Sequence, residues 1–292
     1  MGNPADMMAN NVGKLSPEVA AERLGQVRGY STLDRNADGT MVEWDIKKEA
    51  RETPTPEAVR TGINNWGDAA THYEGRKVVI FGAGSSTLKQ ELGLLNGELV
   101  YGINWTYKWF APTFLQCFDQ KPMMSLLECK DLPPDFHRRT LLVHGESRQA
   151  LVDKRFAEGP NTMQTLPIRT STNAVGPSEE PGGVVPHGPN SLIMALGAVS
   201  WLKPERIVLV GFDFGGAHFW GDGRTEGAIC HYGLSGSLKA NAVPKLRALR
   251  DDLMITKGVP IVQVGETELD VFPGLDSLED ALYTDREAFL WQ

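Results

Sequence analysis

The sequence has few cysteines, no block of basic residues and no long apolar run. Its three cysteines, Cys117, Cys129 and Cys230, are widely spaced and form no Cys-x-x-Cys pair. A disulfide framework and a cysteine zinc site are therefore excluded, and a reducing cytoplasm is the expected location. No apolar run reaches the roughly 20 residues of a membrane-spanning helix. Residues 1–14 also lack the apolar core of a signal peptide.

Basic residues are also fewer than acidic ones. The 292 residues include 29 Lys and Arg against 37 Asp and Glu, so the formal net charge is −8. This balance argues against binding a nucleic-acid backbone by bulk charge. It does not exclude a small phosphate ligand, because backbone amides of a glycine-rich turn can hold one without net positive charge.

The composition divides the chain into two parts. Residues 1–75 contain short helical patterns, at 17–27 and from Thr55 to about His72, each without a rich apolar face. These patterns predict a small, mainly helical N-terminal extension that is stable only when docked on something larger. Residues 76–292 are expected to form the main domain.

In the main domain, short apolar runs alternate with helical patterns. This alternation predicts an α/β domain with a Rossmann-like, mostly parallel sheet, right-handed crossovers and helices on both faces. The expected strands cover residues 78–81, 99–103, 114–118, 140–143, 207–211 and 260–264, and the expected helices cover 191–202 and 242–257. Residues from about 153 to 189 show no strong periodicity, so we expect a long loop there, either a lid, a binding loop or a disordered segment.

A glycine-rich turn follows the first expected strand. Gly82, Gly84, Ser85 and Ser86 stand between that strand and an expected helix, so backbone amides and the helix start could both face a phosphate. The turn lacks the third glycine of a dinucleotide fingerprint and the lysine of a P-loop. We expect these four residues to contact a nucleotide, with a plain strand–helix connection as the alternative.

Polar residues end three of the expected strands. Asn104, Asp119 and Asp213 each follow a strand, and the carboxyl ends of parallel strands form the ligand-binding edge of open α/β sheets. A nucleoside offers hydroxyls and base edges that such side chains bind. We expect these residues, together with Asn190, to bind a nucleotide. The alternative for any one of them is a helix N-cap.

Two histidines are candidates for catalysis. His231 lies in the run from Cys230 to Ser237, and His187 lies in the expected long loop. An imidazole with a pKa of about 6.5 can remove a proton from a hydroxyl nucleophile. His218 is a rival candidate. For each of them the alternative is a histidine with no chemical role.

Residues 34–45 follow the pattern of a calcium-binding loop. Asp34, Asn36, Asp38 and Asp45 occupy positions one, three, five and twelve, with glycine at position six. Two features depart from that pattern, because Asp45 replaces the usual glutamate and Val42 supplies no side-chain oxygen. The segment is either a Ca²⁺ site or a polar turn.

Taken together, the motifs from residue 77 onward resemble those of the bacterial family-42 sialyltransferases. Residues 81–88 resemble the nucleotide-binding turn of that family, and 101–104 resemble its second strand with a nucleotide-contacting asparagine. Residues 191–214 resemble its helix–strand unit ending in Gly-x-Asp-Phe, and 231–233 resemble the segment with its catalytic histidine. Motility-associated glycosyltransferases that modify flagellin, archaeal 6-hydroxymethylpterin diphosphokinases and uncharacterised phage proteins have similar patterns.

The resemblance implies a glycosyltransferase with a GT-A variant of the Rossmann-like fold. The donor would be a nucleotide-activated sugar, most closely a CMP-sugar, and no metal cofactor would be required. His231 would be the general base, and Arg169 would contact phosphate. The tyrosines that bind the leaving phosphate in the family are missing here. His187 lies in the corresponding segment and would take over their role. The acceptor is unknown, and the fold often forms homo-oligomers.

Two alternatives remain open. In the pterin diphosphokinases acidic residues hold Mg²⁺, so a magnesium-dependent pyrophosphokinase would use Asp119 and Asp213. The missing tyrosines and the appended N-terminal region favour a third possibility, a non-catalytic binding or assembly protein that retains only the fold.

Overall fold

The computed structural model describes residues 53–129, 132–158, 163–188, 190–214, 236–265, 267 and 270–285. The chain forms two compact units, Met1–Asp45 and Ile46–Gln292. The first unit lies outside the described residues, and with it the helical pattern at 17–27. The described residues all belong to the second unit.

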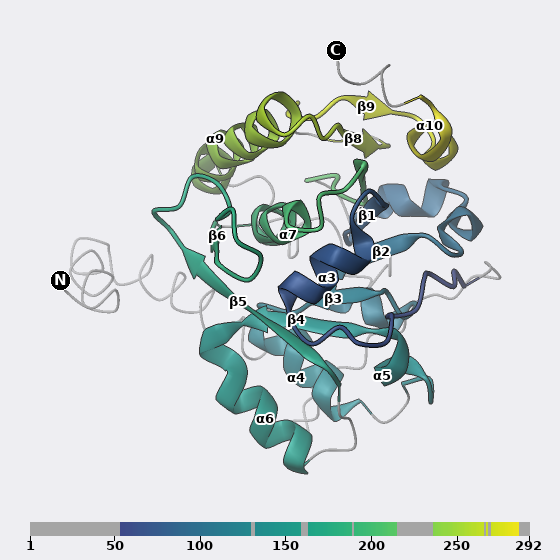
Figure 1. Ribbon diagram of the computed structural model, residues 1–292. Helices are drawn as coiled ribbons and strands as arrows, with labels where there is room; N and C mark the ends of the chain where they lie inside the picture. Colours follow the sequence, from purple (N-terminus) through teal and green to yellow (C-terminus); the bar gives the residue numbers. More distant parts are fainter. Residues whose placement is uncertain are drawn as a thin grey trace, which may run out of the picture. The chain divides into compact units, whose positions relative to one another are not determined.

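In the described residues, nine strands form a single parallel sheet in the order β6-β5-β4-β3-β2-β1-β7-β8-β9 (Figure 1). The strands are β1 (Lys77–Phe81), β2 (Leu99–Ile103), β3 (Phe114–Gln116), β4 (Leu141–Gly145), β5 (Thr165–Ser171), β6 (Val184–Pro186), β7 (Arg206–Val210), β8 (Ile261–Val264) and β9 (Gly274–Leu275). Neighbouring strands run parallel throughout. The predicted α/β class and Rossmann-like sheet are confirmed.

Helices cover both faces of this sheet. They are α3 (Trp66–Tyr73), α4 (Gln120–Glu128), α5 (Phe136–Arg139), α6 (Gln149–Glu158), α7 (Ser191–Ser200), α9 (Gly236–Asp251) and α10 (Leu278–Tyr283). Short 3-10 turns add η1 (Ser85–Lys89), η2 (Leu92–Leu95), η3 (Asn104–Lys108) and η4 (Glu146–Arg148), and α9 ends in a π-helical turn, η5 (Asp252–Thr256). One face packs against α3, α7 and α9, and the opposite face packs against α4, α5 and α6 (Figure 1).

The strands form where the sequence has short runs of β-branched and aromatic residues. Val78 and Ile80 of β1 join the apolar cluster beneath α7, whereas Leu115 and Leu142 belong to the cluster beneath α4 and α6. Because side chains alternate across a strand, a sheet buried on both faces needs apolar residues at consecutive positions. This explains why the continuous apolar runs predicted six of the nine strands.

Residues 53–75 pack against the main sheet. Ile63, Trp66 and Tyr73 are buried in the large cluster, and the Trp66 ring stacks on Phe114 of β3 at a centroid distance of 6.0 Å. The expected boundary after residue 75 therefore falls within this unit. The expected helix from Thr55 is also shorter in the structure, because it begins only at Trp66, where the Asn65 side chain accepts a hydrogen bond from the amide of Asp68 at 2.9 Å.

Residues 55–60 form an extended amino-edge strap instead of the first helical turns. Every second amide of this segment donates a hydrogen bond to a residue outside it. Thr55 donates to the Asn96 side chain, Glu57 to the Glu98 carbonyl and Val59 to the Arg139 carbonyl. A spacing of two residues between bonded amides is that of an extended chain. The strap thus crosses the amino ends of β1 to β4.

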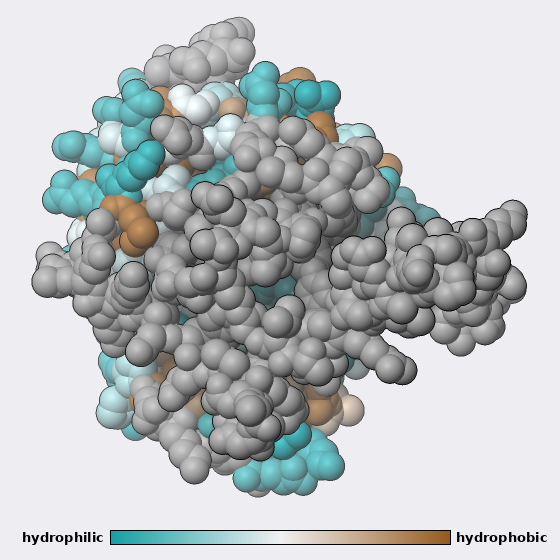
Figure 2. All heavy atoms as spheres, turned by 180° about the vertical axis from the view of Figure 1, so that it is seen from behind, coloured by the Kyte–Doolittle hydropathy of each residue, from teal (hydrophilic) through white to brown (hydrophobic). Residues whose placement is uncertain are grey.

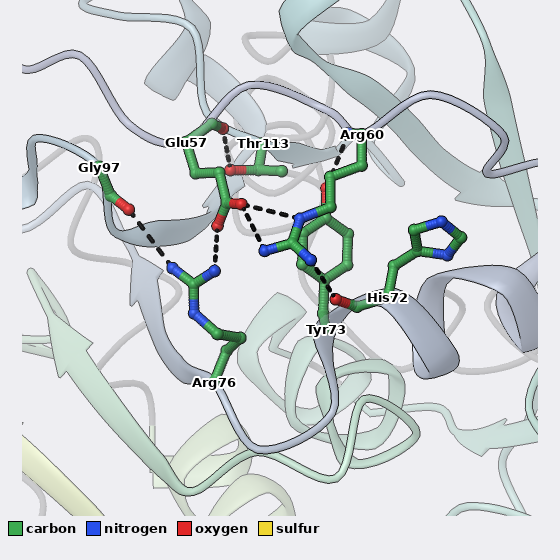
Figure 3. A network of polar contacts seen from close by, with 7 residues as sticks. All are labelled: Glu57, Arg60, His72, Tyr73, Arg76, Gly97 and Thr113. Atoms are coloured by element: carbon green, nitrogen blue, oxygen red, sulfur yellow. Dashed lines mark hydrogen bonds and ion pairs between the residues drawn. The ribbon is translucent and has the colours of Figure 1, made fainter.

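Glu57 is the centre of this strap (Figure 3). Its carboxylate forms ion pairs with Arg60 Nη2 and Arg76 Nη1, each at 2.9 Å, and its carbonyl accepts a hydrogen bond from the buried Thr113 hydroxyl at 2.5 Å. Arg76 and Thr113 stand directly before β1 and β3. The network therefore joins the strap to the starts of two strands.

The prediction of a long loop from about 153 to 189 is wrong. The second half of α6, β5 and β6 all fall within it. Leu166 and Ile168 are buried while Pro167 and Arg169 are exposed, so β5 follows the period of two that marks a strand with one buried face. This alternation is short, and Pro167 interrupts it near the start of the strand. A proline argues against a strand in a sequence pattern, so β5 was not predicted.

The segment between β5 and β6 is pinned to the body of the unit. The Trp201 indole donates to the Ser178 carbonyl at 2.8 Å, and Gly182 approaches the Trp66 ring. On the face shown in Figure 2 hydrophilic residues predominate among those coloured, and apolar ones form small separate patches. None of the helices in the described residues is long and apolar enough to cross a membrane.

Candidate functional site

The order of the strands reverses at one seam. From β1 the chain proceeds outward through β2 to β6, and then returns to place β7 on the other side of β1. In open α/β sheets the crevice at such a reversal, outside the carboxyl ends of the strands, is the usual ligand site. The glycine turn follows β1 and Gly211 follows β7, so both border this seam.

The backbone of the glycine turn is bonded across the seam. The amide of Gly82 donates to the Val210 carbonyl and that of Gly84 to the Gly211 carbonyl, both at 2.8 Å. A Cβ on Gly82 would lie 2.5 Å from the Gly211 carbonyl oxygen. Glycine is required there because two backbones approach closely, and not because of a left-handed conformation.

Asp213 fills the space beside Gly84. Its carboxylate accepts a hydrogen bond from the Ser86 amide at 2.8 Å and a second one from the Ser86 hydroxyl. A Cβ added to Gly84 would overlap this carboxylate. The strand-end aspartate and the glycine turn, expected to share one edge, are therefore in direct contact.

This contact changes the predicted role of the turn. The turn was expected to lead into a helix whose start faces a phosphate, but it leads into the five-residue 3-10 turn η1. The amides of Gly82, Gly84 and Ser86 are all committed to internal acceptors. In this arrangement the Asp213 carboxylate lies beside the turn, and these three amides donate to acceptors within the protein.

Asn104 and Asp119 meet next to the seam, as their positions after β2 and β3 predict. The Asn104 side-chain amide donates to Asp119 Oδ2 at 2.9 Å. Asn104 has a φ of 52°, a left-handed conformation that is uncommon outside glycine and occurs at functional sites. Its Oδ1 atom is buried and accepts no hydrogen bond from the described residues. Asp119 is exposed.

A second non-glycine residue with a positive φ stands on the other side of the seam. Phe214, directly after Asp213, has a φ of 55°. A third, Lys203, lies past the end of α7, where a left-handed residue is an ordinary helix terminator. The two that lack this explanation, Asn104 and Phe214, both lie at the carboxyl edge near the seam.

Cys117 lies behind the Asn104–Asp119 pair in a fully buried position. Its fully buried thiol donates to the Asn104 carbonyl at 3.9 Å. Burial, followed by the nearby Asp119 carboxylate, raises the pKa of the Cys117 thiol well above its ordinary value. The reactive form of a cysteine is the thiolate, which burial disfavours here, and the hydrogen bond of the thiol supports the asparagine turn.

The sequence patterns did not predict a polar connection through the core. The Tyr101 hydroxyl donates to Gln116 Oε1, and Gln116 Nε2 donates to the Ser191 carbonyl, each at 2.9 Å. Burial raises the pKa of Tyr101 well above its ordinary value, so the hydroxyl remains a donor. These two hydrogen bonds link β2 and β3 to the first residue of α7. The sequence feature that could have predicted them is a glutamine within an otherwise apolar strand.

The remaining described candidates lie at the ends of β5 and β6. His187 directly follows β6 with an exposed side chain, and its amide donates to the Ser171 carbonyl at 2.8 Å. Arg169 is exposed in β5, opposite Val184. Asn190 caps α7, because its side-chain oxygen accepts from the Leu192 amide at 2.7 Å.

Several predicted residues lie outside the described residues. These are His231 and the calcium-loop residues Asp34, Asn36, Asp38 and Asp45, and the Ser85 side chain is likewise not described. Within the described ranges, His, Cys, Asp and Glu side chains form no group of three that could hold a metal ion.

Comparison with known proteins gives little to add to this geometry. The sequence matches neither a family model nor a curated protein. Among solved structures, the C-domain of a bacterial malonyl-CoA reductase with NADP shares 16% identity, with a TM-score of 0.24. The match covers 86% of this chain but only 35% of that chain, so the present chain spans about a third of its length. A likeness of this size carries no argument about function.

The described residues thus assemble a polar edge without a metal cluster. Around the seam lie a carboxylate held by Ser86, an asparagine oxygen without a donor and an exposed aspartate. These groups are hydrogen-bond acceptors, and they suit a ligand that brings hydroxyl or amine donors.

Proposed function

We propose that this chain binds a nucleotide at the carboxyl edge beside the β1–β7 seam and acts as a glycosyltransferase that uses a nucleotide-activated sugar. The observation that carries the proposal is the gathering of Asp213, Asn104 and Asp119 at the one strand reversal of the sheet. Open α/β sheets bind nucleotides at this position.

The acceptor groups fit the nucleoside part of such a ligand. The Asp213 carboxylate is held by Ser86 beside the seam, and ribose hydroxyls would donate to it there. The unsatisfied Asn104 oxygen would accept from a base amine or a hydroxyl, which removes the cost of a buried acceptor without a partner.

The chemistry that we propose is transfer of the sugar from a CMP-linked donor. His231 would act as general base and remove the proton from the acceptor hydroxyl. His187, when protonated, would stabilise the phosphate that leaves. Neither step needs a metal. Support for these roles comes from the resemblance of the sequence motifs, and the site geometry supports only the placement of a nucleotide.

One observation favours a second candidate. Asp119 has an exposed carboxylate beside the seam, and such oxygens bind Mg²⁺. A magnesium-dependent pyrophosphokinase would use it with Asp213, which is already held by Ser86. This function requires ATP binding that depends on both magnesium and Asp119.

Titration calorimetry with cytidine, uridine and adenine nucleotides, each with magnesium and with chelator, tests both candidates. The proposal expects cytidine nucleotides to bind equally well in chelator. Binding of ATP that is lost on chelation and in Asp119→Asn would instead establish the second candidate. No binding of any nucleotide at millimolar concentration would overturn both, and would leave a non-catalytic binding protein.

The Gly84→Ala variant tests whether the seam is the binding site. Gly84 has a φ of −67°, so alanine fits the backbone, and its Cβ would displace the Asp213 carboxylate from Ser86. We expect at least about tenfold weaker nucleotide binding, the loss of one charge-assisted hydrogen bond. The control is Gly274→Ala, since nothing lies within 4 Å of a Cβ at that position. Equal affinities of the two variants would place the ligand elsewhere.

A further inference from the structure

A glutamine of β8 holds the backbone just past the end of β7. Gln263 lies opposite Leu209 in the parallel ladder, and its side chain is fully buried. Its Nε2 donates to the Phe212 carbonyl at 2.9 Å, and the Thr267 hydroxyl donates to the same oxygen at 3.2 Å. Two donors, one from β8 and one shortly after it, therefore fix the carbonyl that directly precedes Asp213.

This carbonyl determines where Asp213 lies. Because the peptide bond is planar, the Phe212 carbonyl and the Cα of Asp213 belong to one rigid group. The next residue, Phe214, has a left-handed φ of 55°, a conformation that persists in an aromatic residue only where its surroundings hold it. The hydrogen bonds to Phe212 thus hold the turn that places the Asp213 carboxylate beside Ser86.

The end of β8 also contacts Ser86, the residue that binds this carboxylate. A Cβ on Gly265 would lie 3.0 Å from the Ser86 Cβ and 3.3 Å from its hydroxyl oxygen. The Gly265 amide in turn donates to the Leu275 carbonyl of β9 at 2.8 Å. Both partners of the Asp213–Ser86 contact are therefore supported by β8, Asp213 through Gln263 and Ser86 through Gly265.

The oxygen of the Gln263 amide shows that stability does not explain this glutamine. Oε1 is buried and accepts no hydrogen bond from the described residues, and a buried acceptor without a donor lowers stability. The other residues of β8 are apolar, and an apolar side chain here would avoid this cost. The Phe212 carbonyl would keep its bond from Thr267. The effect of the glutamine is to fix the position of Asp213.

We propose that Gln263 is a positioning residue for Asp213, and that it makes the seam select ribonucleotides over their deoxy analogues. This inference rests on the proposed function, in which ribose hydroxyls donate to the Asp213 carboxylate. Such a bond needs an O–O distance of about 2.5–3.0 Å. Without the Gln263 donor the Phe212–Asp213 peptide is held less firmly, this distance varies more, and the preference for ribose decreases.

The test measures ribose preference by calorimetry with cytidine monophosphate and its 2′-deoxy and 3′-deoxy analogues. We expect the wild type to bind at least one deoxy analogue about tenfold more weakly, the value of one charge-assisted hydrogen bond. Gln263→Met keeps the length of the side chain without its amide, and should lower this ratio by about threefold or more. An unchanged ratio, or equal losses of affinity for all three nucleotides, would overturn the inference.

The matched control is Gln116→Met, because Gln116 is also a fully buried glutamine in an apolar strand. Its amide bonds Tyr101 and Ser191, so this variant should lower the midpoint of urea unfolding and keep the ribose preference. Gln263→Met should keep the wild-type midpoint, since it removes a buried oxygen that has no donor among the described residues. A loss of ribose preference in Gln116→Met as well would mean that the preference follows general stability, and would overturn the inference.

A double variant tests whether Gln263 acts through Asp213. In the Asp213→Ala background, Gln263→Met should cause no further loss of affinity for cytidine monophosphate, since the group that it positions is gone. Additive losses in the double variant would overturn the positioning role.

The wild type alone separates this inference from the proposed function. If it binds no nucleotide, the proposed function fails and the inference fails with it. If it binds cytidine monophosphate and both deoxy analogues with equal affinity, nucleotide binding stands, and the inference that Gln263 and Asp213 select ribose is overturned.

Discussion

His144 is a buried histidine with one nitrogen left without a partner among the described residues. It lies in β4 with its side chain fully buried, and Nδ1 donates to the Gly145 carbonyl at 2.9 Å. A carbonyl can only accept, so Nδ1 carries the proton and Nε2 is an acceptor, for which the described residues supply no donor. Burial lowers the pKa of His144, against smaller opposing effects of the Gly145 hydrogen bond and the Asp153 carboxylate.

This geometry predicts loss of stability in weak acid. At a pH below about 6.5, the ordinary pKa of a histidine, His144 is protonated in the unfolded chain but stays neutral in the folded protein. The free energy of unfolding therefore falls as the pH drops toward the lowered folded pKa, by at most about 1.4 kcal/mol per pH unit. Urea unfolding between pH 7.5 and 5.5 measures this slope.

The comparison is His144→Asn, which cannot titrate in this range. We expect it to show a smaller decrease in stability between pH 7.5 and 5.5 than the wild type. The exposed His137 provides the control, since His137→Asn should retain the wild-type slope. A wild-type slope in His144→Asn would contradict the prediction.

Single residues show what sequence patterns can predict about the site. Asn104, Asp119 and Asp213 follow apolar runs, and a run that ends in a polar residue predicts a position at the carboxyl edge. Their pairing is a different matter. That Asp213 binds the Ser86 amide, and that Asn104 binds Asp119, depends on the strand order. No local pattern encodes this order, because it is decided by which strands pair across long separations.

Among elements, the strands buried on both faces were predictable, whereas β5, β6 and the strap were not. A run such as residues 78–81, followed at once by glycines, is typical of a strand buried on both faces. β6 has only three residues, and β5 contains Pro167. The strap has helix-starting residues at Thr55 and Pro56, but its amides find acceptors on Asn96, Glu98 and Arg139. Tertiary hydrogen bonds overrode a weak local preference.

The strap gives a prediction about stability. The buried Thr113 hydroxyl donates to the Glu57 carbonyl at 2.5 Å, and Thr113→Val keeps the shape of the side chain while removing this donor. The carbonyl would then lose a partner at the amino edge, at a cost of about 1–2 kcal/mol in the free energy of unfolding. Chemical denaturation measures the difference.

Thr71→Val is the matched control for this substitution. Thr71 also donates from its hydroxyl to a backbone carbonyl, that of Gly67, but it lies on the exposed side of α3. Its replacement should change the free energy of unfolding by no more than about 0.5 kcal/mol. Equal effects of the two substitutions would mean that the strap contributes nothing through Thr113.

At the scale of the whole unit, the seam divides the chain but not the core. Residues 53–188 supply β1 to β6, and residues 190–285 supply β7 to β9. One apolar cluster nevertheless extends from Ile168 of β5 to Ile261 of β8, through α7 and α9. Because the two halves share this core, unfolding of either half would expose the apolar face of the other.

We therefore predict one cooperative unfolding transition for this unit, both with and without ligand. A nucleotide at the β1–β7 seam contacts groups from both halves, Asn104 from one and Asp213 from the other. At a hundredfold excess over its dissociation constant it should raise the free energy of unfolding by about 2.7 kcal/mol and shift the whole transition. Circular dichroism and near-ultraviolet absorbance, followed together in urea, should give coincident curves. If the ligand stabilised only one half, the curves would separate into two steps, and the shared core would not couple the halves as its continuity implies.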